Sequence, residues 1–300
     1  MSIAGNLYTH QDVNVRKTWA LMTGAFVLLI GLGWILSQTY GDPTILYLFA
    51  AFSIVGNFVA YWKSDRIALA MSGAQPVTRE ESVRLYRIVE NLCITAGLPL
   101  PRLHVIEAAQ INAFATGRDP KHAAIAVTRG ALEQLDDNEL AGVLAHELSH
   151  VGNRDILVST VVVVMAGIIA IVSDWFLRSL AFGGNRDRNN GGVVMLALGI
   201  AAAILAPLAA TLIRMAVSRK REFLADASGA LLTRYPEGLA SALEKIARDQ
   251  APLPHAHTAT AHLFLSSPFK GKSARNWMTH LFMTHPPLED RIRILRGMPH

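Results

Sequence analysis

The residues with the clearest chemical potential lie in the segment LAHELSHVGNRD, residues 144–155. On a helix, positions i and i+4 share one face, so His146 and His150 can direct both imidazoles at a single ion. Zinc is the usual ion for such a pair. Glu147 lies about 100° around the helix from His146, where it can reach a water on the ion rather than the ion itself. The pattern predicts hydrolysis by an activated water, with Glu147 as general base.

The three fixed letters of this motif also arise by chance, so two histidines on the polar face of an ordinary helix are the alternative. The surrounding sequence favours a metal site on a helix. Asp136 and Glu139 have the spacing of a capping box, and Leu140, Val143 and Leu144 continue at helical spacing.

A catalytic zinc needs a third protein ligand and an open fourth position. The continuation H-x-x-G-x-x-H is absent, because Asn153 and Ile156 occupy the positions of its glycine and last histidine. The segment SRKREFLADASGA, residues 218–230, offers Glu222 and Asp226 at helical spacing i and i+4. Glu222 can complete the ligand set, and Asp226 can fix a ligand histidine by a hydrogen bond. The alternative is a helix start with Glu222 in solvent.

Four apolar runs must position these motifs, and they cover residues 18–36, 44–62, 156–172 and 193–213. Only 17% of the residues are charged, against about 25% in soluble domains. A membrane span needs about 20 apolar residues, which the first, second and fourth runs supply. A buried core helix is the alternative for the third run. The first two runs follow each other across a short loop, which predicts a helical hairpin rather than a cleaved signal peptide.

Basic residues flank the apolar runs and predict the orientation in the membrane. They place the N-terminus, residues 63–155 and the C-terminal segment in the cytoplasm, although Arg178, Arg186 and Arg188 between the third and fourth runs disagree. The net charge of +5 is therefore attributed to membrane flanks and not to a nucleic-acid partner. Cys93 is the single cysteine, which excludes an intrachain disulfide and a cysteine-only metal site.

The segment between the second and third runs predicts a small α+β unit. A capping box at Thr78 and Glu81 predicts a helix that ends at Gly97, and residues 102–106 and 123–128 predict strands. The fold class expected is mainly α with a small β-sheet, combining multi-pass membrane helices with a gluzincin-type zinc metallopeptidase domain. The expected organisation is a transmembrane hairpin (1–62), a first catalytic part (63–155), two further transmembrane helices (156–217) and a second catalytic part (218–300).

These motifs together resemble the HtpX family of integral-membrane zinc metalloproteases, distant relatives of the CaaX prenyl proteases. The match covers nearly the whole chain and includes INAFATGRDP and THPPLEDRIRIL besides the two segments above. The resemblance implies one zinc ion per subunit, held by His146, His150 and Glu222. It also implies Glu147 as general base and acid, and Asp226 as the partner of a ligand histidine.

Further residue roles follow from the resemblance. Asn112, Ala113 and Phe114 are expected on an edge strand that pairs with an extended peptide substrate. His285 or Arg291 is expected to stabilise the oxyanion. The alternatives are local capping by His285, and an ion pair of Arg291 with Glu222 or Asp226. Asn153 and Asp155 are expected to be structural residues at a helix end. Five histidines fit no ligand set: His104, His255, His257, His262 and His280.

The function expected is a zinc endopeptidase of the inner (plasma) membrane, with its active site facing the cytoplasm. The resemblance implies quality control of misfolded membrane proteins, so the expected partners are polypeptides and the lipid bilayer. The alternatives are a zinc transporter and a non-catalytic scaffold. The apolar runs argue against a transporter, since Asn57 is their most polar residue. The presence of Glu147 argues against a scaffold.

Overall fold

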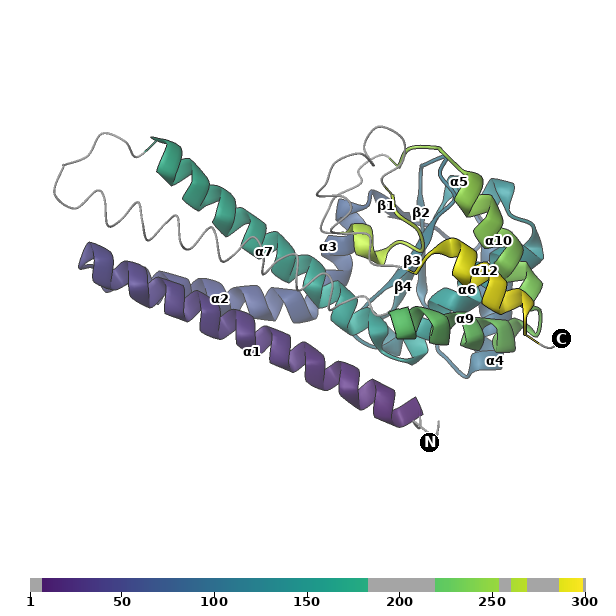
Figure 1. Ribbon diagram of the computed structural model, residues 1–300, viewed down its shortest axis with the longest axis horizontal. Helices are drawn as coiled ribbons and strands as arrows, with labels where there is room; N and C mark the ends of the chain where they lie inside the picture. Colours follow the sequence, from purple (N-terminus) through teal and green to yellow (C-terminus); the bar gives the residue numbers. More distant parts are fainter. Residues whose placement is uncertain (1–6, 183–218, 254–259, 269–285, 299–300) are drawn as a thin grey trace.

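The computed structural model describes residues 7–182, 219–253, 260–268 and 286–298. Three long helices form an arm that projects from a domain built around a small sheet (Figure 1). The arm consists of α1 (Leu7–Tyr40), α2 (Thr44–Trp62) and α7 (Asp155–Phe182). The expected fold class, mainly α with a small sheet, is confirmed.

Helices α1 and α2 are long and apolar enough to cross a membrane. Their candidate spans are Gln11–Tyr40 and Thr44–Trp62, with mean hydropathies of 2.0 and 1.7. The second span has the bounds predicted from the sequence. Large apolar side chains such as Val27, Ile54 and Phe58 are 59–61% exposed along them. Such surface is stable against lipid chains and unfavourable in water.

The third apolar run forms most of α7, but this helix is not a candidate span by itself. Many of its apolar side chains between Ile156 and Val172 are buried, and they pack against the hairpin and α3 (Ser64–Met71). Together with the preceding α6 (Asp137–Gly152) it would make a third candidate span, bent by 83°. The HExxH helix therefore does not continue straight into the third apolar run. Arg154 adopts a left-handed conformation, with φ 57°, and turns the chain between the helices. The fourth run lies outside the described residues.

The sheet has four strands, in the order β1-β2-β4-β3. They are β1 (Ala74–Pro76), β2 (Arg102–Ile106), β3 (Ala113–Thr116) and β4 (Ala124–Thr128). The central pair β2–β4 is parallel, and the two edge strands are antiparallel to their neighbours. Both strands predicted from apolar runs are present. Of the residues predicted on an edge strand, Ala113 and Phe114 lie in β3, which is an edge of the sheet, and Asn112 immediately precedes it.

Helices around the sheet and packed on one another complete the domain. They are α4 (Val83–Ala96), α5 (Arg129–Gln134), α6, α9 (Arg219–Thr233), α10 (Pro236–Arg248) and α12 (Leu288–Arg296), with short 3-10 turns at Pro120–His122 and Ala261–Leu263. The α4 helix starts later than predicted. The bonds of the Thr78–Glu81 box form, but they close a turn, and the helix starts after Ser82. Gly97, in the left-handed region with φ 64°, ends α4 as predicted.

Candidate metal centre and active site

Helix α6 carries the HExxH motif through the middle of the domain. The Asp136 side chain accepts bonds from the backbone of Asn138 and Glu139, and Glu139 returns a bond to the Asp136 N–H. This is the predicted capping box, and it fixes the start of the helix. The apolar face of α6 is buried between the sheet, α9 and α10. The motif histidines therefore stand on a rigid element.

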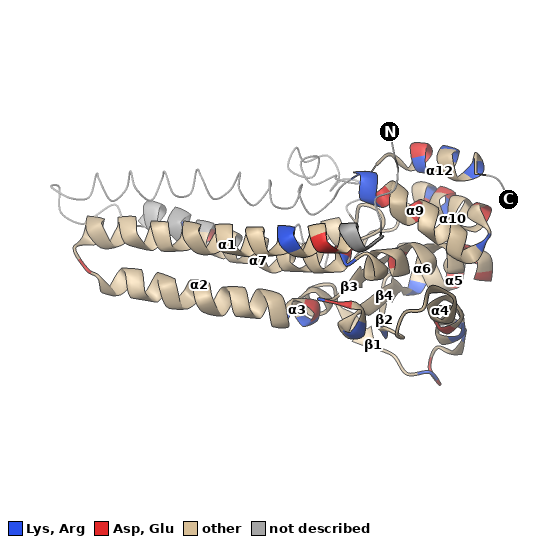
Figure 2. Cartoon of the chain, turned by 90° about the horizontal axis from the view of Figure 1, so that it is seen from below, with Lys and Arg blue, Asp and Glu red and all other residues tan. Residues whose placement is uncertain are grey.

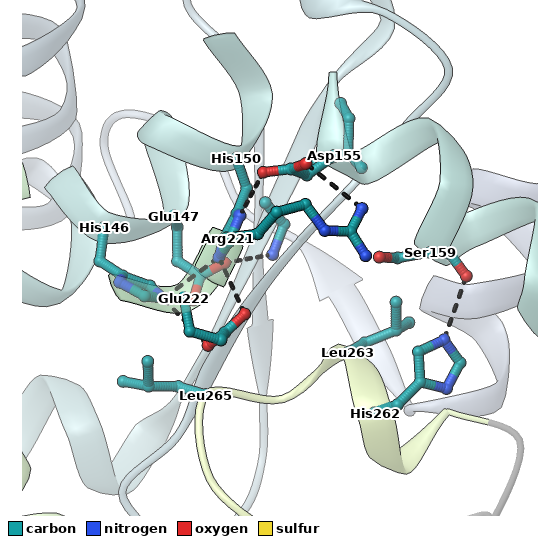
Figure 3. Close-up of a pocket in the computed structure, with 12 residues that line it drawn as sticks. His146, Glu147, His150, Asp155, Ser159, Arg221, Glu222, His262, Leu263 and Leu265 are labelled. Atoms are coloured by element: carbon teal, nitrogen blue, oxygen red, sulfur yellow. Dashed lines mark hydrogen bonds and ion pairs between the residues drawn. The ribbon is translucent and has the colours of Figure 1, made fainter. Parts of the chain in front are cut away.

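Helix α9 packs against α6 because one of its residues has no side chain. A Cβ placed on Gly229 would lie 3.0 Å from the backbone nitrogen of His146, closer than most side chains tolerate. The close approach brings the preceding turns of α9 over the motif. Glu222, two helical turns before Gly229, consequently faces His146 and His150, as Figure 3 shows.

Three potential ligand atoms converge between the two helices. His146 Nε2 lies 3.2 Å from His150 Nε2. Glu222 Oε1 lies 3.6 Å from His150 Nε2, and Glu222 Oε2 lies 3.9 Å from His146 Nε2. A tetrahedral ion with bonds of about 2.0–2.2 Å separates its ligands by about 3.3–3.6 Å. Two imidazoles and a carboxylate at these distances fit zinc, and the group is a candidate metal site.

His146 is fixed from behind by a buried ion-pair network. Its Nδ1 lies 2.9 Å from Asp226 Oδ1. Arg291, which is completely buried, donates to both Asp226 oxygens at 2.7 and 2.8 Å. Burial favours a higher pKa for Asp226, but Arg291 and the hydrogen bond with His146 outweigh burial and hold this pKa at about 2. The charged carboxylate leaves His146 Nε2 directed toward Glu222.

His150 has a carboxylate partner that the sequence did not reveal. Its Nδ1 lies 3.0 Å from Asp155 Oδ2, although Asp155 was expected to be only structural. The other Asp155 oxygen accepts from Asn14 Nδ2 at 2.7 Å and from Arg221 Nη1 at 3.3 Å. In the sequence, the available signal for this role was a carboxylate just beyond the end of the metal-binding helix. Only the bend at Arg154 brings that carboxylate back beside His150. Asn153 is a helix C-cap, as expected.

Glu147 is almost completely buried beside the two histidines, with 2% of its surface exposed. Its Oε2 accepts a hydrogen bond of 2.8 Å from the backbone N–H of Ala115 on β3. Burial raises the pKa of Glu147, against the opposing influence of His146 and His150. A carboxylate with raised proton affinity is suited to take up a proton and release it again.

The histidines, Glu147 and Glu222 line a small cavity of about 30 Å³. That space suits an ion with a water molecule rather than an organic cofactor. His262 also borders the cavity, and its Nε2 lies 3.1 Å from the Ser159 carbonyl oxygen (Figure 3). The sequence had given no reason to place His262 near the motif.

The residues predicted to contact substrate do not line this cavity. The Asn112 side chain is buried and bonds the Ser266 carbonyl, and Phe114 is buried against Phe264. The Ala113 carbonyl accepts a bond from the Leu265 N–H. The strand residue that borders the cavity is Ala115. His285, predicted as an oxyanion donor, lies outside the described residues.

Comparison with known proteins decides the family. The model of "Peptidase family M48" matches residues 79–299, a segment that contains all the cavity residues. The chain belongs to peptidase family M48. It is therefore a zinc metalloprotease, and the expected kinship with the HtpX proteases is confirmed by its relatives.

Three of these M48 relatives carry the name "Protease HtpX homolog". The one from Thermoanaerobacter pseudethanolicus is 45% identical, over 97% of this chain and 98% of its own. The one from Caldanaerobacter subterraneus subsp. tengcongensis is also 45% identical, with the same coverage. That from Thermococcus kodakarensis is 48% identical over 92% of each chain. Among solved structures, S. mikatae Ste24p aligns with a TM-score of 0.46 and 17% identity, covering 96% of this chain and 66% of its own.

Proposed function

We propose that this protein is an endopeptidase that hydrolyses peptide bonds of polypeptide substrates beside the membrane surface. The convergence of His146, His150 and Glu222, with Glu147 in the same cavity, is the observation that supports it most strongly. One zinc ion held by these three ligands would acidify a water molecule and polarise the scissile carbonyl. The Glu147 carboxylate would take the proton from the attacking water and deliver it to the leaving amine.

The reaction also depends on residues that position the zinc ligands, namely Asp226, Asp155 and Arg291. Asp226 orients His146, and Asp155 orients His150. Arg291 was expected either to stabilise the oxyanion or to form an ion pair. Its two bonds to Asp226 favour the ion pair, so we assign it to positioning. Oxyanion stabilisation by His285 stays a prediction.

Asp226→Asn is expected to lower zinc affinity by about 10- to 100-fold, the usual effect of losing the carboxylate behind a ligand histidine. The variant preserves the size of the side chain but loses its charge, which leaves the buried Arg291 with the more distant Glu222 carboxylate, at 4.0 Å, as its counter-ion. Competition with a fluorescent chelator measures the affinity. The isosteric change Asp137→Asn at an exposed position serves as control. Equal affinities of the two variants would refute the role given to Asp226.

Chelation is expected to abolish cleavage of an unstructured substrate such as casein, because His146, His150 and Glu222 supply no chemistry without their ion. Full activity should return when zinc reaches one equivalent per chain. Atomic absorption and a fluorescent casein assay follow the two quantities together. Activity that survives complete removal of metal would contradict the proposal.

A substrate chain is proposed to extend along the edge strand β3, with its register moved from the predicted residues 112–114 toward Ala115. The outer side of Ala113 is already paired with Leu265, whereas Ala115 reaches the cavity and its N–H holds Glu147. A peptide backbone paired there would lie against the candidate metal site.

The membrane orientation is also proposed: the domain is cytoplasmic and the α1–α2 loop is external. A cysteine at Tyr40 should react with an impermeant maleimide in intact cells, and one at Thr95 only after lysis. Both sites are exposed. The native Cys93 gives little background, because burial raises the pKa of its thiol to about 11. The reverse labelling pattern would invert the topology.

The location of the cluster disfavours a zinc transporter. Within the described ranges, the metal-ligand group lies on α6 and α9 and not on α1 or α2, the two helices that are candidate spans by themselves. The resemblance to HtpX proteases favours misfolded membrane proteins as substrates. This suits the fold, because α6, which carries the HExxH motif, leads into the arm helix α7 (Figure 1).

A further inference from the structure

A second cavity, of about 480 Å³, lies where α2 ends and α3 begins. It shares no lining residue with the metal cavity. Among the described residues that line it, Asp65 is the one acid, and the basic residues are Lys63, Arg66, Arg102, Arg118 and Lys121. These side chains come from the end of α2, from α3, from β2 and from the segment after β3.

The positive charge of this cavity is only partly compensated. Arg102 pairs with Asp65 at 2.5 Å. In the part of the chain that the structure describes, no ion pair reaches Lys63, Arg66 or Lys121, and all three are exposed. Three adjacent cations without a counter-ion make an attractive position for a multiply charged anion.

The cavity lies at the level where a bilayer would end. Helix α2 is uncharged from Thr44 to Trp62, and charged residues begin immediately after it at α3 (Figure 2). Phe58 and Trp62 line the cavity and are 59% and 45% exposed. Arg118 lies 4.7 Å from the centre of the Trp62 ring. Aromatic side chains at the end of a span mark the headgroup layer.

We propose that this cavity binds the phosphate headgroup of an anionic phospholipid. Lys63, Arg66 and Lys121 would hold the phosphate, and Phe58 with the apolar face of α2 would contact the acyl chains. Basic residues next to a span attract anionic headgroups in this way. Free inorganic phosphate shares the headgroup chemistry but lacks the chains that Phe58 and α2 would contact.

Native mass spectrometry of the full chain in neutral detergent tests the site. The probes are dioctanoyl phosphatidylglycerol, dioctanoyl phosphatidylcholine and inorganic phosphate. The triple variant Lys63→Gln, Arg66→Gln, Lys121→Gln is expected to bind phosphatidylglycerol about tenfold more weakly, or worse. The matched control, Arg79→Gln, Arg87→Gln, Arg293→Gln, removes the same charge from other exposed positions and should bind like the parent.

Each alternative result overturns a defined part of the inference. If both triple variants lost phosphatidylglycerol binding equally, the net charge of the protein, and not this cavity, would be responsible for the binding. Phosphatidylcholine bound as tightly as phosphatidylglycerol would exclude recognition of the anionic headgroup. Inorganic phosphate bound as tightly as the lipid would make this a phosphate site without a lipid.

A separate observation connects the hairpin to the metal centre. Asn14 on α1 is 3% exposed and donates to Asp155 Oδ1 at 2.7 Å and to the Asn153 carbonyl at 3.1 Å. Asp155 in turn holds His150. Gln11 forms a parallel tie, to the Gly152 carbonyl at 2.8 Å, that does not touch Asp155.

We infer that Asn14 is a positioning residue: it holds Asp155 so that the His150 ring keeps its Nε2 toward His146 and Glu222. This inference rests on the proposed metal site. The N-terminal membrane helix then completes a metal centre whose ligands all come from later in the chain.

Asn14→Ala is expected to weaken zinc binding about tenfold and to change the visible spectrum of the Co²⁺-substituted protein. Gln11→Ala, the matched control, should alter neither. Failure of the parent to bind zinc would refute the proposed metal site itself. If the parent and the Asn14→Ala variant bound zinc equally well, only the role of Asn14 would be refuted. If Gln11→Ala weakened zinc binding as much as Asn14→Ala, the effect would come from the contacts of α1 in general and not from Asn14.

Discussion

Glu147→Gln is expected to lower kcat for peptide hydrolysis by about 10²- to 10⁴-fold, the usual contribution of a general acid–base. Glutamine has the same shape and can still accept the Ala115 N–H bond that holds the side chain, but its amide cannot take a proton from water. The zinc content should remain that of the parent, since Glu147 is not one of the three clustered ligands.

Single-turnover cleavage of a quenched peptide, with metal analysis of the same sample, measures both quantities. Glu133→Gln, which neutralises an exposed glutamate on α5, is the control. Parent-like cleavage by Glu147→Gln would remove the general base from the mechanism. Loss of zinc together with activity would instead mean that Glu147 supports the metal site.

Loss of a side chain that supports a metal ligand typically weakens metal binding by about 10- to 100-fold. Glu222→Ala is expected to weaken zinc binding by more than this, because it removes one of the three ligands themselves. The metal-free protein should lose little stability, because the repulsion between the buried Glu222 and Glu147 carboxylates opposes the attraction of Glu222 to His150 and Arg291. The rise in Tm that zinc gives the parent, through its preferential binding to the folded state, should therefore disappear.

Thermal unfolding with and without zinc, for parent, Glu222→Ala and the exposed control Glu289→Ala, tests this prediction. A zinc-dependent rise in Tm that survives in Glu222→Ala would show that another residue supplies the third ligand. A large loss of stability in the metal-free variant would show that Glu222 has a structural role.

The metal cluster could be predicted from the sequence because its residues have helical spacing within each of two segments. His146 and His150 share a helix face, and Glu222 and Asp226 have the same spacing on a second helix. The apolar stretch of α2 defined its bounds completely, since composition alone determines a span of that length. A local sequence pattern was sufficient for prediction wherever all residues of the pattern lie on one helix or strand.

The features that were missed depend on contacts between distant segments. Asp155 reaches His150 only because Arg154 turns the chain, and no periodicity announces a left-handed residue. The third run packs against the hairpin, and its apolar composition alone could not choose between a membrane span and the buried helix that was its alternative. Phe114 lies on the expected strand and Asn112 immediately before it, but the segment around Leu265 covers this edge.

Anomalous scattering at the zinc edge, from crystals grown with zinc, tests the central claim most directly. We expect one peak per chain, within bonding distance of His146 Nε2, His150 Nε2 and a Glu222 carboxylate oxygen. A peak held by other residues, or no peak between these three in zinc-replete crystals, would contradict it.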